Sequence, residues 1–351
     1  MAMDRSGRVH AGGAGRLARA AGAIGVAAVL LTGCGPFAAA PKPKAAHAKT
    51  PQAVPGPVSV QGNAAAAKPA GGLGGAIGAV IDNEAAARPQ SGIQNASLVF
   101  EAPTEGGITR FLALFWANGA SQIGPIRSAR IYFDQLAQAY NIPLAHAGGN
   151  VDALKAMRTL GIKNIDQIWT PGASQFFWRS PSRQAPHNLY TSSTLLTRAV
   201  RSLGLTLGPI PAWPRGNLVS GKAAGEVTVD FSGVEQVHWL YANGMYTRYE
   251  GATIDDTLSG APVRARAVLV LNVGEQPDPD PYTPGSIKLD MTGQGTGELA
   301  ADGREVAVRW ERSATGPFTI LNAQGTSPQA MPAPPLWIEL VPPVATVTFG
   351  S

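Results

Sequence analysis

Charged and polar side chains gather between Glu101 and Tyr190, and their types are those that hold anions or move protons. Arginine binds carboxylate and phosphate through paired N–H groups, whereas glutamate and histidine can act as general acid or base. The candidate acid–base residues are Glu101, Glu105, His146 and His187. The candidate ligand-binding residues in these motifs, or just before them, are Arg88, Glu105, Arg110, Arg127, Arg130, Asp134, His146, Arg179, Arg183, His187, Asn188 and Tyr190.

Arg127, Arg130 and Asp134 are spaced by three and four residues, which places them on one stripe of a helix predicted over 127–140. Two arginines at a helix N-terminus conflict with the helix dipole, because that end favours anions. A bound anion, shared by the backbone N–H groups and the two guanidinium groups, would resolve the conflict. The alternative is a structural network in which these arginines pair with nearby carboxylates such as Glu101 and Glu105.

His146 ends a predicted strand and is followed by Ala147-Gly148-Gly149 and by a helix predicted from about 152 to 160. A strand, a glycine turn and a helix are how α/β sheets place ligands at the carboxyl ends of strands. The glycines match neither a dinucleotide fingerprint nor a P-loop, so no nucleotide is inferred and no cofactor is expected. His146 is therefore a candidate base or ligand contact, with a purely structural role as the alternative.

Aromatic residues precede the last charged motif. Ile168-Trp169 and Phe176-Phe177-Trp178 lie beside Arg179, and Arg183, His187, Asn188 and Tyr190 follow within a loop that contains Pro181 and Pro186. Aromatic faces next to arginines suit a sugar ring or a phosphorylated glycan. The same side chains could equally fix this loop to the sheet.

The N-terminal 33 residues have the pattern of an export signal, in which four arginines precede an apolar run from Ala20 to Leu31. Leu31-Thr32-Gly33-Cys34 resembles a bacterial lipobox, so Cys34 is expected to carry lipid such as palmitate and to anchor the chain on the extracytoplasmic face of the cell membrane. An ordinary secretory signal is the alternative. Cys34 is the only cysteine, which excludes an intramolecular disulfide. Residues 34–77 are rich in Ala, Pro and Lys and are expected to form a disordered stalk.

The net charge of +5 comes from the N-terminal segments. Residues 1–33 hold four arginines and one aspartate, residues 34–77 hold four lysines and no acid, and residues 78–351 therefore sum to about −2. The folded part is thus not the basic surface that nucleic-acid binding requires, and no nucleic-acid partner is expected.

The roughly 270 residues after the stalk are enough for one large or two modest domains. We predict an α+β protein with a mixed α/β domain over 78–205, a Pro/Gly-rich connection, and a β-rich domain over 226–351 that forms a sandwich or small barrel. Strands are predicted at 77–83, 96–101, 109–116 and 143–149 in the first domain. In the second they are predicted at 226–231, 237–241, 245–249, 265–273, 286–291, 305–312, 318–321 and 336–341.

Asn243-Gly244 and Asp302-Gly303 are hairpin turn signals in the second domain. Gly293 to Gly297 is expected to be a flexible loop. Asp255 and Asp256 are adjacent carboxylates of a kind that is usually solvated, although a cation site is the alternative.

Four motifs together resemble the YerB-like family of bacterial lipoproteins, and the likeness runs in order over roughly 78–345. The motifs are Arg88-Pro-Gln-Ser-Gly92, Glu105-Gly-Gly-Ile-Thr-Arg110, Ile123-Gly-Pro-Ile-Arg-Ser-Ala-Arg130 and Ala185-Pro-His-Asn-Leu-Tyr190. The resemblance implies an N-terminal and a C-terminal domain and a lipid-anchored location, but no reaction. Ser97 and Asn150 depart from the family pattern, so neither is assigned an essential catalytic role.

Three function classes remain open from the sequence. We favour an envelope lipoprotein that binds an anionic or glycan ligand in an Arg/His/Glu-lined cleft. The alternatives are an envelope hydrolase or transferase acting on a phosphodiester or glycosidic bond, and an assembly factor without a small-molecule site. No Gly-x-Ser-x-Gly, His-Glu-x-x-His or catalytic cysteine supports the enzyme. His146 and His187 lack a recognised metal-site spacing, so no metal is predicted, and the oligomeric state is left open.

Overall fold

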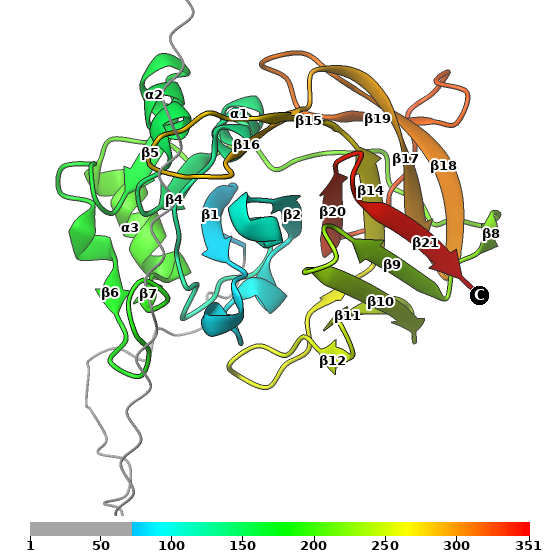
Figure 1. The fold of residues 1–351 in the computed structure, drawn as a ribbon, viewed down its shortest axis with the longest axis horizontal. Coiled ribbons are helices and arrows are strands. Elements are labelled where there is room, and N and C mark those ends of the chain that lie inside the picture. The colour runs from blue at the N-terminus through cyan, green and yellow to red at the C-terminus, as the bar shows by residue number, and fades with distance from the viewer. Residues whose placement is uncertain (1–71) are drawn as a thin grey trace, which may run out of the picture. The chain divides into compact units, whose positions relative to one another are not determined.

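The computed structural model describes residues 72–351, which fold as the predicted α+β protein (Figure 1). The export signal, Cys34 and the stalk up to residue 71 lie outside the described residues. The helices are α1 (Ile131–Ala139), α2 (Val151–Thr159) and α3 (Ser193–Ser202). No helix in this described part is long and apolar enough to cross a membrane.

One large sheet runs through both halves of the chain. Its strands follow the order β19-β18-β17-β14-β20-β2-β3-β1-β4-β5, and β8 pairs with β18 off this path. The N-terminal strands are β1 (Ile77–Asp82), β2 (Leu98–Pro103), β3 (Thr109–Phe115), β4 (Pro143–His146) and β5 (Lys163–Asp166). The C-terminal strands are β8 (Lys222–Ala223), β14 (Ala267–Asn272), β17 (Gly293–Ala301), β18 (Arg304–Arg312), β19 (Thr319–Asn322) and β20 (Leu336–Val341).

The central strands β1, β2, β3, β14 and β20 are almost completely buried, which explains their unbroken apolar runs. Tyr132, Phe133 and Leu136 of α1 and Met157 of α2 pack with Leu112 on one face of the sheet. Leu196 of α3 packs on the other face.

A smaller sheet packs against that other face. It is ordered β12-β11-β10-β9-β21, with β13 paired to β11. Its strands are β9 (Glu226–Asp230), β10 (Gln236–Ala242), β11 (Met245–Glu250), β12 (Thr253–Ile254), β13 (Arg264–Ala265) and β21 (Thr346–Gly350). Trp239 of the small sheet and Trp337 of the large sheet meet edge to face, with ring centroids 5.0 Å apart. Two short hairpins complete the fold: β6 (Trp178–Arg179) with β7 (Leu189–Tyr190), and β15 (Gly274–Pro277) with β16 (Ile287–Asp290).

The two halves of the chain are joined through β20, which lies between β2 and β14 and is parallel to both. Leu336 pairs with Leu98 in one direction and with Ala267 in the other. Strand β20, from the C-terminal half, therefore continues the sheet of the N-terminal half. The division into domains at 78–205 and 226–351 stays a prediction.

Three local expectations differ from the structure. Gly293–Gly297 is the start of strand β17 rather than a loop, because Gly295 faces Trp310 so closely that a Cβ would lie 2.4 Å from the indole. The helix predicted from residue 127 begins at Ile131, so Arg127 lies outside the helix, before its N-cap residue Arg130. The stalk was predicted to reach residue 77, but Ala76 is buried and hydrogen-bonds to Gly208 on both its N–H and its carbonyl.

Candidate functional site

Glu105 lies at the tip of the hairpin that joins β2 to β3, where the sequence Glu105-Gly-Gly predicts a tight turn. Gly106 and Gly107 have φ values of 78° and 74°, a left-handed conformation that residues with a side chain rarely adopt. The turn carries the Glu105 side chain toward two arginines. About a quarter of that side chain is exposed.

Arg130 and Arg110 both face Glu105. Arg130 makes a two-pronged contact with the carboxylate: its Nε donates to Oε2 at 2.9 Å and its Nη2 donates to Oε1. Arg110 Nη2 lies 3.9 Å from Glu105 Oε1, and its Nη1 donates to the carbonyl of Ser128. Both arginines are almost fully buried, so each is fixed in direction. Arg130 is the N-cap residue of α1, and no side chain caps that helix end.

Asp82 connects this pair to a third arginine and a histidine. Asp82 ends β1 and pairs in register with Arg110 of β3. Its carboxylate lies 2.9 Å from Arg127 Nε and 2.8 Å from His187 Nδ1. His187 Nε2 contacts Glu84 at 2.8 Å. The structure therefore joins Glu105, Arg110, Arg127, Arg130 and His187 into one network, which we call the arginine cluster.

The arginine cluster has a surplus of positive charge at its centre. Burial, followed by the charge of Arg130, lowers the pKa of Arg110 to about 10. Burial alone would raise the pKa of Glu105, but hydrogen bonding and charge from Arg130 and charge from Arg110 outweigh it, so this pKa lies below its usual value. Glu105 is thus a carboxylate at neutral pH. Asp82 is already shared by Arg127 and His187, which leaves Glu105 as the carboxylate that contacts both Arg110 and Arg130.

Other predicted ligand residues lie in structural contacts. Arg179 Nη1 donates to Asn188 Oδ1 at 2.7 Å, within the β6–β7 hairpin. Tyr190 is buried, and its ring stacks against Trp178 with centroids 6.1 Å apart. Arg183 donates to the carbonyls of Ala87 and Pro89, so it holds the loop of the β6–β7 hairpin against the segment after β1.

His146 and Asp134 do not join the arginine cluster. His146 is fully buried at the end of β4; its Nδ1 contacts the Gly148 carbonyl at 2.9 Å and its Nε2 contacts Asn164 Oδ1 at 2.6 Å. Asp134 is buried on α1 among apolar side chains, and neither carboxyl oxygen has a hydrogen-bond partner among residues 72–351. Burial, together with the charge of Asp166, raises the pKa of Asp134 well above its usual value, which favours its neutral form.

Glu101 belongs to a second network, sealed between the two sheets. Arg248 Nη2 donates to both Glu101 oxygens at 2.7 and 3.0 Å, and its Nη1 donates to Asp255 at 2.8 Å and to Glu250. The Arg248 guanidinium also lies over the rings of Phe111 and Trp337, at 5.2 and 5.4 Å. Glu101 and Arg248 are both fully buried.

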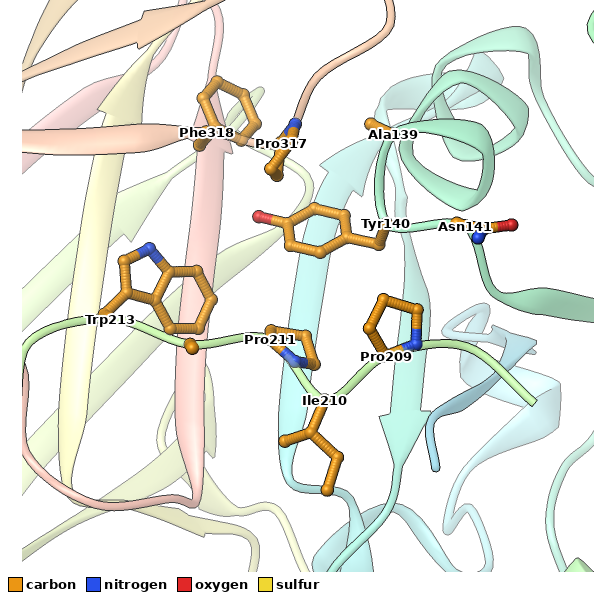
Figure 2. A pocket seen from close by; sticks show the side chains of 10 residues that line it. Ala139, Tyr140, Asn141, Pro209, Ile210, Pro211, Trp213, Pro317 and Phe318 are labelled. Atoms are coloured by element: carbon orange, nitrogen blue, oxygen red, sulfur yellow. The ribbon is translucent and has the colours of Figure 1, made fainter. Parts of the chain in front are cut away.

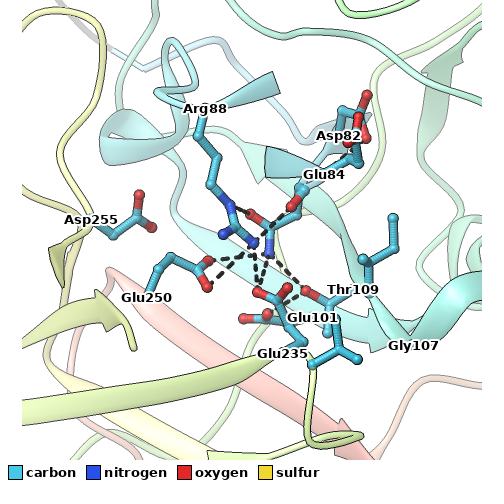
Figure 3. Close-up of polar contacts among 12 residues, drawn as sticks. Asp82, Glu84, Arg88, Glu101, Gly107, Thr109, Glu235, Glu250 and Asp255 are labelled. Atoms are coloured by element: carbon cyan, nitrogen blue, oxygen red, sulfur yellow. Dashed lines mark hydrogen bonds and ion pairs between the residues drawn. The ribbon is translucent and has the colours of Figure 1, made fainter. Parts of the chain in front are cut away.

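The outer side of this second network contains a close pair of carboxyl groups (Figure 3). Arg88 Nη2 donates to Glu235 at 2.6 Å and lies 3.3 Å from Glu250. Asn83 Nδ2 donates to one oxygen of each glutamate at 3.2 Å. Burial and the neighbouring Glu250 raise the pKa of Glu235 to about 9. Burial opposes ionisation of Glu250, but Arg248 prevails and lowers its pKa to about 2. The pair therefore holds one proton at neutral pH.

Two more carboxyl groups complete what we call the acid cluster, formed by Arg88, Glu101, Glu235, Arg248, Glu250, Asp255 and Glu339. Burial raises the pKa of Asp255 to about 6 despite Arg248. Burial and the charge of Glu101 raise the pKa of Glu339 well above its usual value. Asp255 was expected to be solvated, but it is buried because it closes the third side of Arg248.

Most members of the acid cluster were missed in the sequence. A signal was present in β11, where Arg248 and Glu250 share the alternating face of Tyr246, a large residue suited to burial. Charged residues in phase with buried aromatic residues indicate an internal ion pair. Glu339 gives the same signal, because it lies two positions after the buried Trp337 in the apolar strand 336–341. No comparable signal indicates Glu235.

Within residues 72–351, no group of three or more His, Cys, Asp or Glu side chains is arranged to hold a metal ion. Glu101 is sealed, and both ring nitrogens of His146 are engaged. The site geometry thus offers paired guanidinium groups for an anion more clearly than an exposed acid–base pair.

Comparison with known proteins places the chain in a family. The family described as "Protein of unknown function (DUF3048) N-terminal domain" matches residues 60–206, and its C-terminal domain matches residues 227–333. The chain belongs to this DUF3048 family. The "Putative lipoprotein YerB" of Bacillus subtilis (strain 168) is 29% identical over 246 residues, covering 67% of this chain and 72% of the relative.

The crystal structure of the YerB protein from Bacillus subtilis has the same fold. It superposes with a TM-score of 0.69 at 24% identity, covering 79% of this chain and 95% of the other. The sequence-based resemblance to the YerB-like lipoproteins and the α+β architecture are therefore confirmed. The family description leaves ligand and reaction open, and the chain is a lipoprotein homologue of unknown function.

Proposed function

We propose that the protein is a membrane-anchored envelope lipoprotein that binds an anionic group, a phosphate or a carboxylate, at the arginine cluster. The observation that carries the proposal is the contact of two buried arginines, Arg110 and Arg130, with the single carboxylate of Glu105. Arg127 lies nearby with about a quarter of its side chain exposed. Anchoring through Cys34 on the extracytoplasmic face accords with the lipobox and with the lipoprotein relative.

Glu105 acts in this proposal as an internal occupant of the anion site. It sits on a two-glycine turn, and its side chain is partly exposed, so its carboxylate can swing away from the two arginines. The oxygens of a ligand phosphate or carboxylate would then accept hydrogen bonds from the arginine N–H groups that Glu105 no longer contacts. The uncapped N-terminus of α1 at Arg130 adds favourable potential for an anion.

Phosphate titration of arginine variants tests this proposal. The full-length protein in detergent should bind inorganic phosphate or citrate saturably in calorimetry. Arg130→Gln and Arg127→Gln should each weaken binding about 10- to 100-fold, because a hydrogen bond to a charged group is worth about 1.5–3 kcal/mol. Arg127 is partly exposed, so its variant reports on binding even if Arg130→Gln is poorly folded.

Arg201→Gln is the matched control, since Arg201 is exposed on α3 and outside the arginine cluster. It should bind phosphate as the unmodified protein does. The proposal fails if neither phosphate nor citrate binds, or if Arg127→Gln and Arg130→Gln both leave the affinity unchanged.

A further inference from the structure

A cavity opens at the edge strand β5, and none of its lining residues belongs to the arginine cluster. Its volume is about 420 Å³, within the range of small-molecule sites. Helix α2 contributes Leu154, Met157 and Arg158, strand β5 contributes Asn164 and Asp166, and the following loop contributes Trp169. The lining thus combines apolar side chains with a carboxylate, an amide and a guanidinium group.

The cavity lies at the carboxyl ends of parallel strands. β4 and β5 are parallel, and His146 pairs with Asp166 at their last position. The loop after β5 folds back over the glycine turn after β4: a Cβ on Gly148 would lie 3.2 Å from Ile168 Cδ1 and 3.9 Å from Trp169 Nε1. Gly148 has a φ of 67°, so this close approach depends on glycine. Ligands of open α/β sheets bind at this edge.

Asp166 is fully buried in the cavity wall, and only one of its two carboxylate oxygens has hydrogen-bond partners. Its Oδ1 accepts from the backbone N–H groups of Gly148 at 2.8 Å and Ile168 at 2.9 Å. Its Oδ2 has no hydrogen-bond partner among residues 72–351. Buried polar atoms normally have partners, so an orphaned carboxylate oxygen beside a cavity points to a donor that a ligand supplies.

Asn164 and Trp169 indicate which chemical class of ligand fits the cavity. The hydrogen bond to His146 Nε2 holds the Asn164 amide in one orientation, so His146 is a positioning residue here. Trp169 is 67% exposed and Ile168 53%, which is unusual for large apolar side chains on adjacent positions. An exposed indole beside planar hydrogen-bonding groups matches a molecule with one apolar face and a rim of hydroxyl groups.

We propose that this cavity binds a pyranose sugar ring. The ring stacks on Trp169, a hydroxyl group donates to Asp166 Oδ2, and the Asn164 amide and Arg158 guanidinium hydrogen-bond the neighbouring hydroxyl groups. A free monosaccharide and a sugar unit within an envelope glycan share this chemistry. The inference is independent of the arginine cluster, because the two sites share no residue.

The aromatic pocket beside the Pro/Gly-rich connection offers a useful contrast (Figure 2). It has a volume of about 210 Å³ and is lined by Tyr140, Trp213, Phe318 and three prolines, with Asn141 as its only amide. It has an aromatic surface but no carboxylate or guanidinium. The sugar chemistry therefore favours the cavity at β5.

Saturation-transfer NMR on the full-length protein in detergent tests the sugar site. The probes are glucose, galactose, mannose and N-acetylglucosamine, followed by soluble glycan strands released from cell walls. At least one probe should receive saturation, and Trp169→Ala should weaken its binding at least tenfold. Asp166→Asn retains an oxygen for the two backbone N–H groups but loses the free acceptor, so it should also weaken binding.

Val219→Ala is the control for loss of an exposed large apolar side chain, because Val219 is 89% exposed and precedes β8, which pairs with β18 rather than with a strand of the cavity. It should bind the same probe unchanged. Binding of glycan strands without binding of monosaccharides, if abolished by Trp169→Ala, identifies the polymer as the ligand. No binding by any probe, or equal binding by Trp169→Ala and the unmodified protein, overturns the proposal.

Discussion

Glu101 and Glu105 are four residues apart at the end of β2, yet they belong to clusters with opposite charge balance. Glu101 points between the sheets into the acid cluster, where five carboxyl groups surround Arg88 and Arg248. Glu105 turns outward to the arginine cluster, where Arg110 and Arg130 face this one carboxylate while Arg127 pairs with Asp82. The acid cluster has more carboxyl groups than guanidinium groups, whereas at the centre of the arginine cluster two guanidinium groups face one carboxylate.

The two surpluses are relieved by different means. A carboxyl group can be neutralised by a proton, and the acid cluster accordingly holds a proton on Glu235 at neutral pH, while the pKa of Glu339 is also raised well above its usual value. An arginine cannot lose its charge under physiological conditions, so a surplus of guanidinium needs an anion. The acid cluster can therefore be sealed without a ligand. The arginine cluster, with Arg127 and Glu105 partly exposed, is suited to receive one.

The largest expected effect is on the stability of the sealed cluster. Arg248→Met removes the cation that Glu101, Glu250 and Asp255 share while retaining much of the side-chain volume. Breaking a buried ion pair by removing one partner costs about 3–5 kcal/mol, so the free energy of unfolding should fall by that amount. Urea unfolding at pH 7, followed by tryptophan fluorescence, measures it.

Arg264→Met is the matched control, because Arg264 is an exposed arginine on the same small sheet. Its effect should stay within the ~0.5 kcal/mol usual for surface substitutions. An Arg248→Met protein that is as stable as this control would show that the acid cluster is not an energetically connected unit.

A smaller effect should appear in the pH dependence of stability. The pKa of Glu235 is raised to about 9, so the folded state keeps a proton that the unfolded chain has lost above its ordinary pKa near 4.5. Stability from this group is therefore lost as the pH rises from about 5 to 9. Glu235→Gln keeps a neutral side chain throughout. The free energy of unfolding of Glu235→Gln should therefore rise by about 1–3 kcal/mol relative to that of the unmodified protein across that pH interval.

Urea unfolding at pH 5, 7 and 9 provides the comparison, with the exposed Glu311→Gln as control. The difference between Glu235→Gln and the unmodified protein should grow with pH, and the control difference should stay flat. A difference that shrinks toward pH 9 would mean that Glu235 is ionised in the folded protein.

The sequence predicted much of the fold because its strands are long and apolar. The strand residues 109–115 are buried throughout, and the Asn243-Gly244 turn joins β10 to β11 as its dipeptide predicts. The prediction of a flexible loop at Gly293–Gly297 was wrong because of a contact between strands: Gly295 makes room for Trp310 on the next strand. Helix α3 was not predicted, although Ser192 caps its first turn.

The candidate site was predictable only where its members are local in sequence. Glu105, Arg110, Arg127 and Arg130 come from one stretch, and the structure joins them. Asp82, which connects Arg127 to His187, was predicted only as part of the strand at 77–83. The acid cluster depends on β20 entering the sheet beside β2, which sets Glu339 opposite Glu101. That pairing joins residues more than two hundred positions apart, and no local pattern predicts it.

The central claim is that Glu105 occupies an anion site. Whether phosphate affinity rises or falls when Glu105 is replaced tests this claim. Glu105→Gln removes the internal carboxylate from Arg110 and Arg130 while preserving the shape of the side chain. Calorimetric titration with inorganic phosphate should then show affinity at least severalfold tighter than in the unmodified protein, because the ligand no longer competes with Glu105. Equal or weaker phosphate binding by Glu105→Gln would show that Glu105 is a structural partner of the arginines and would contradict the account.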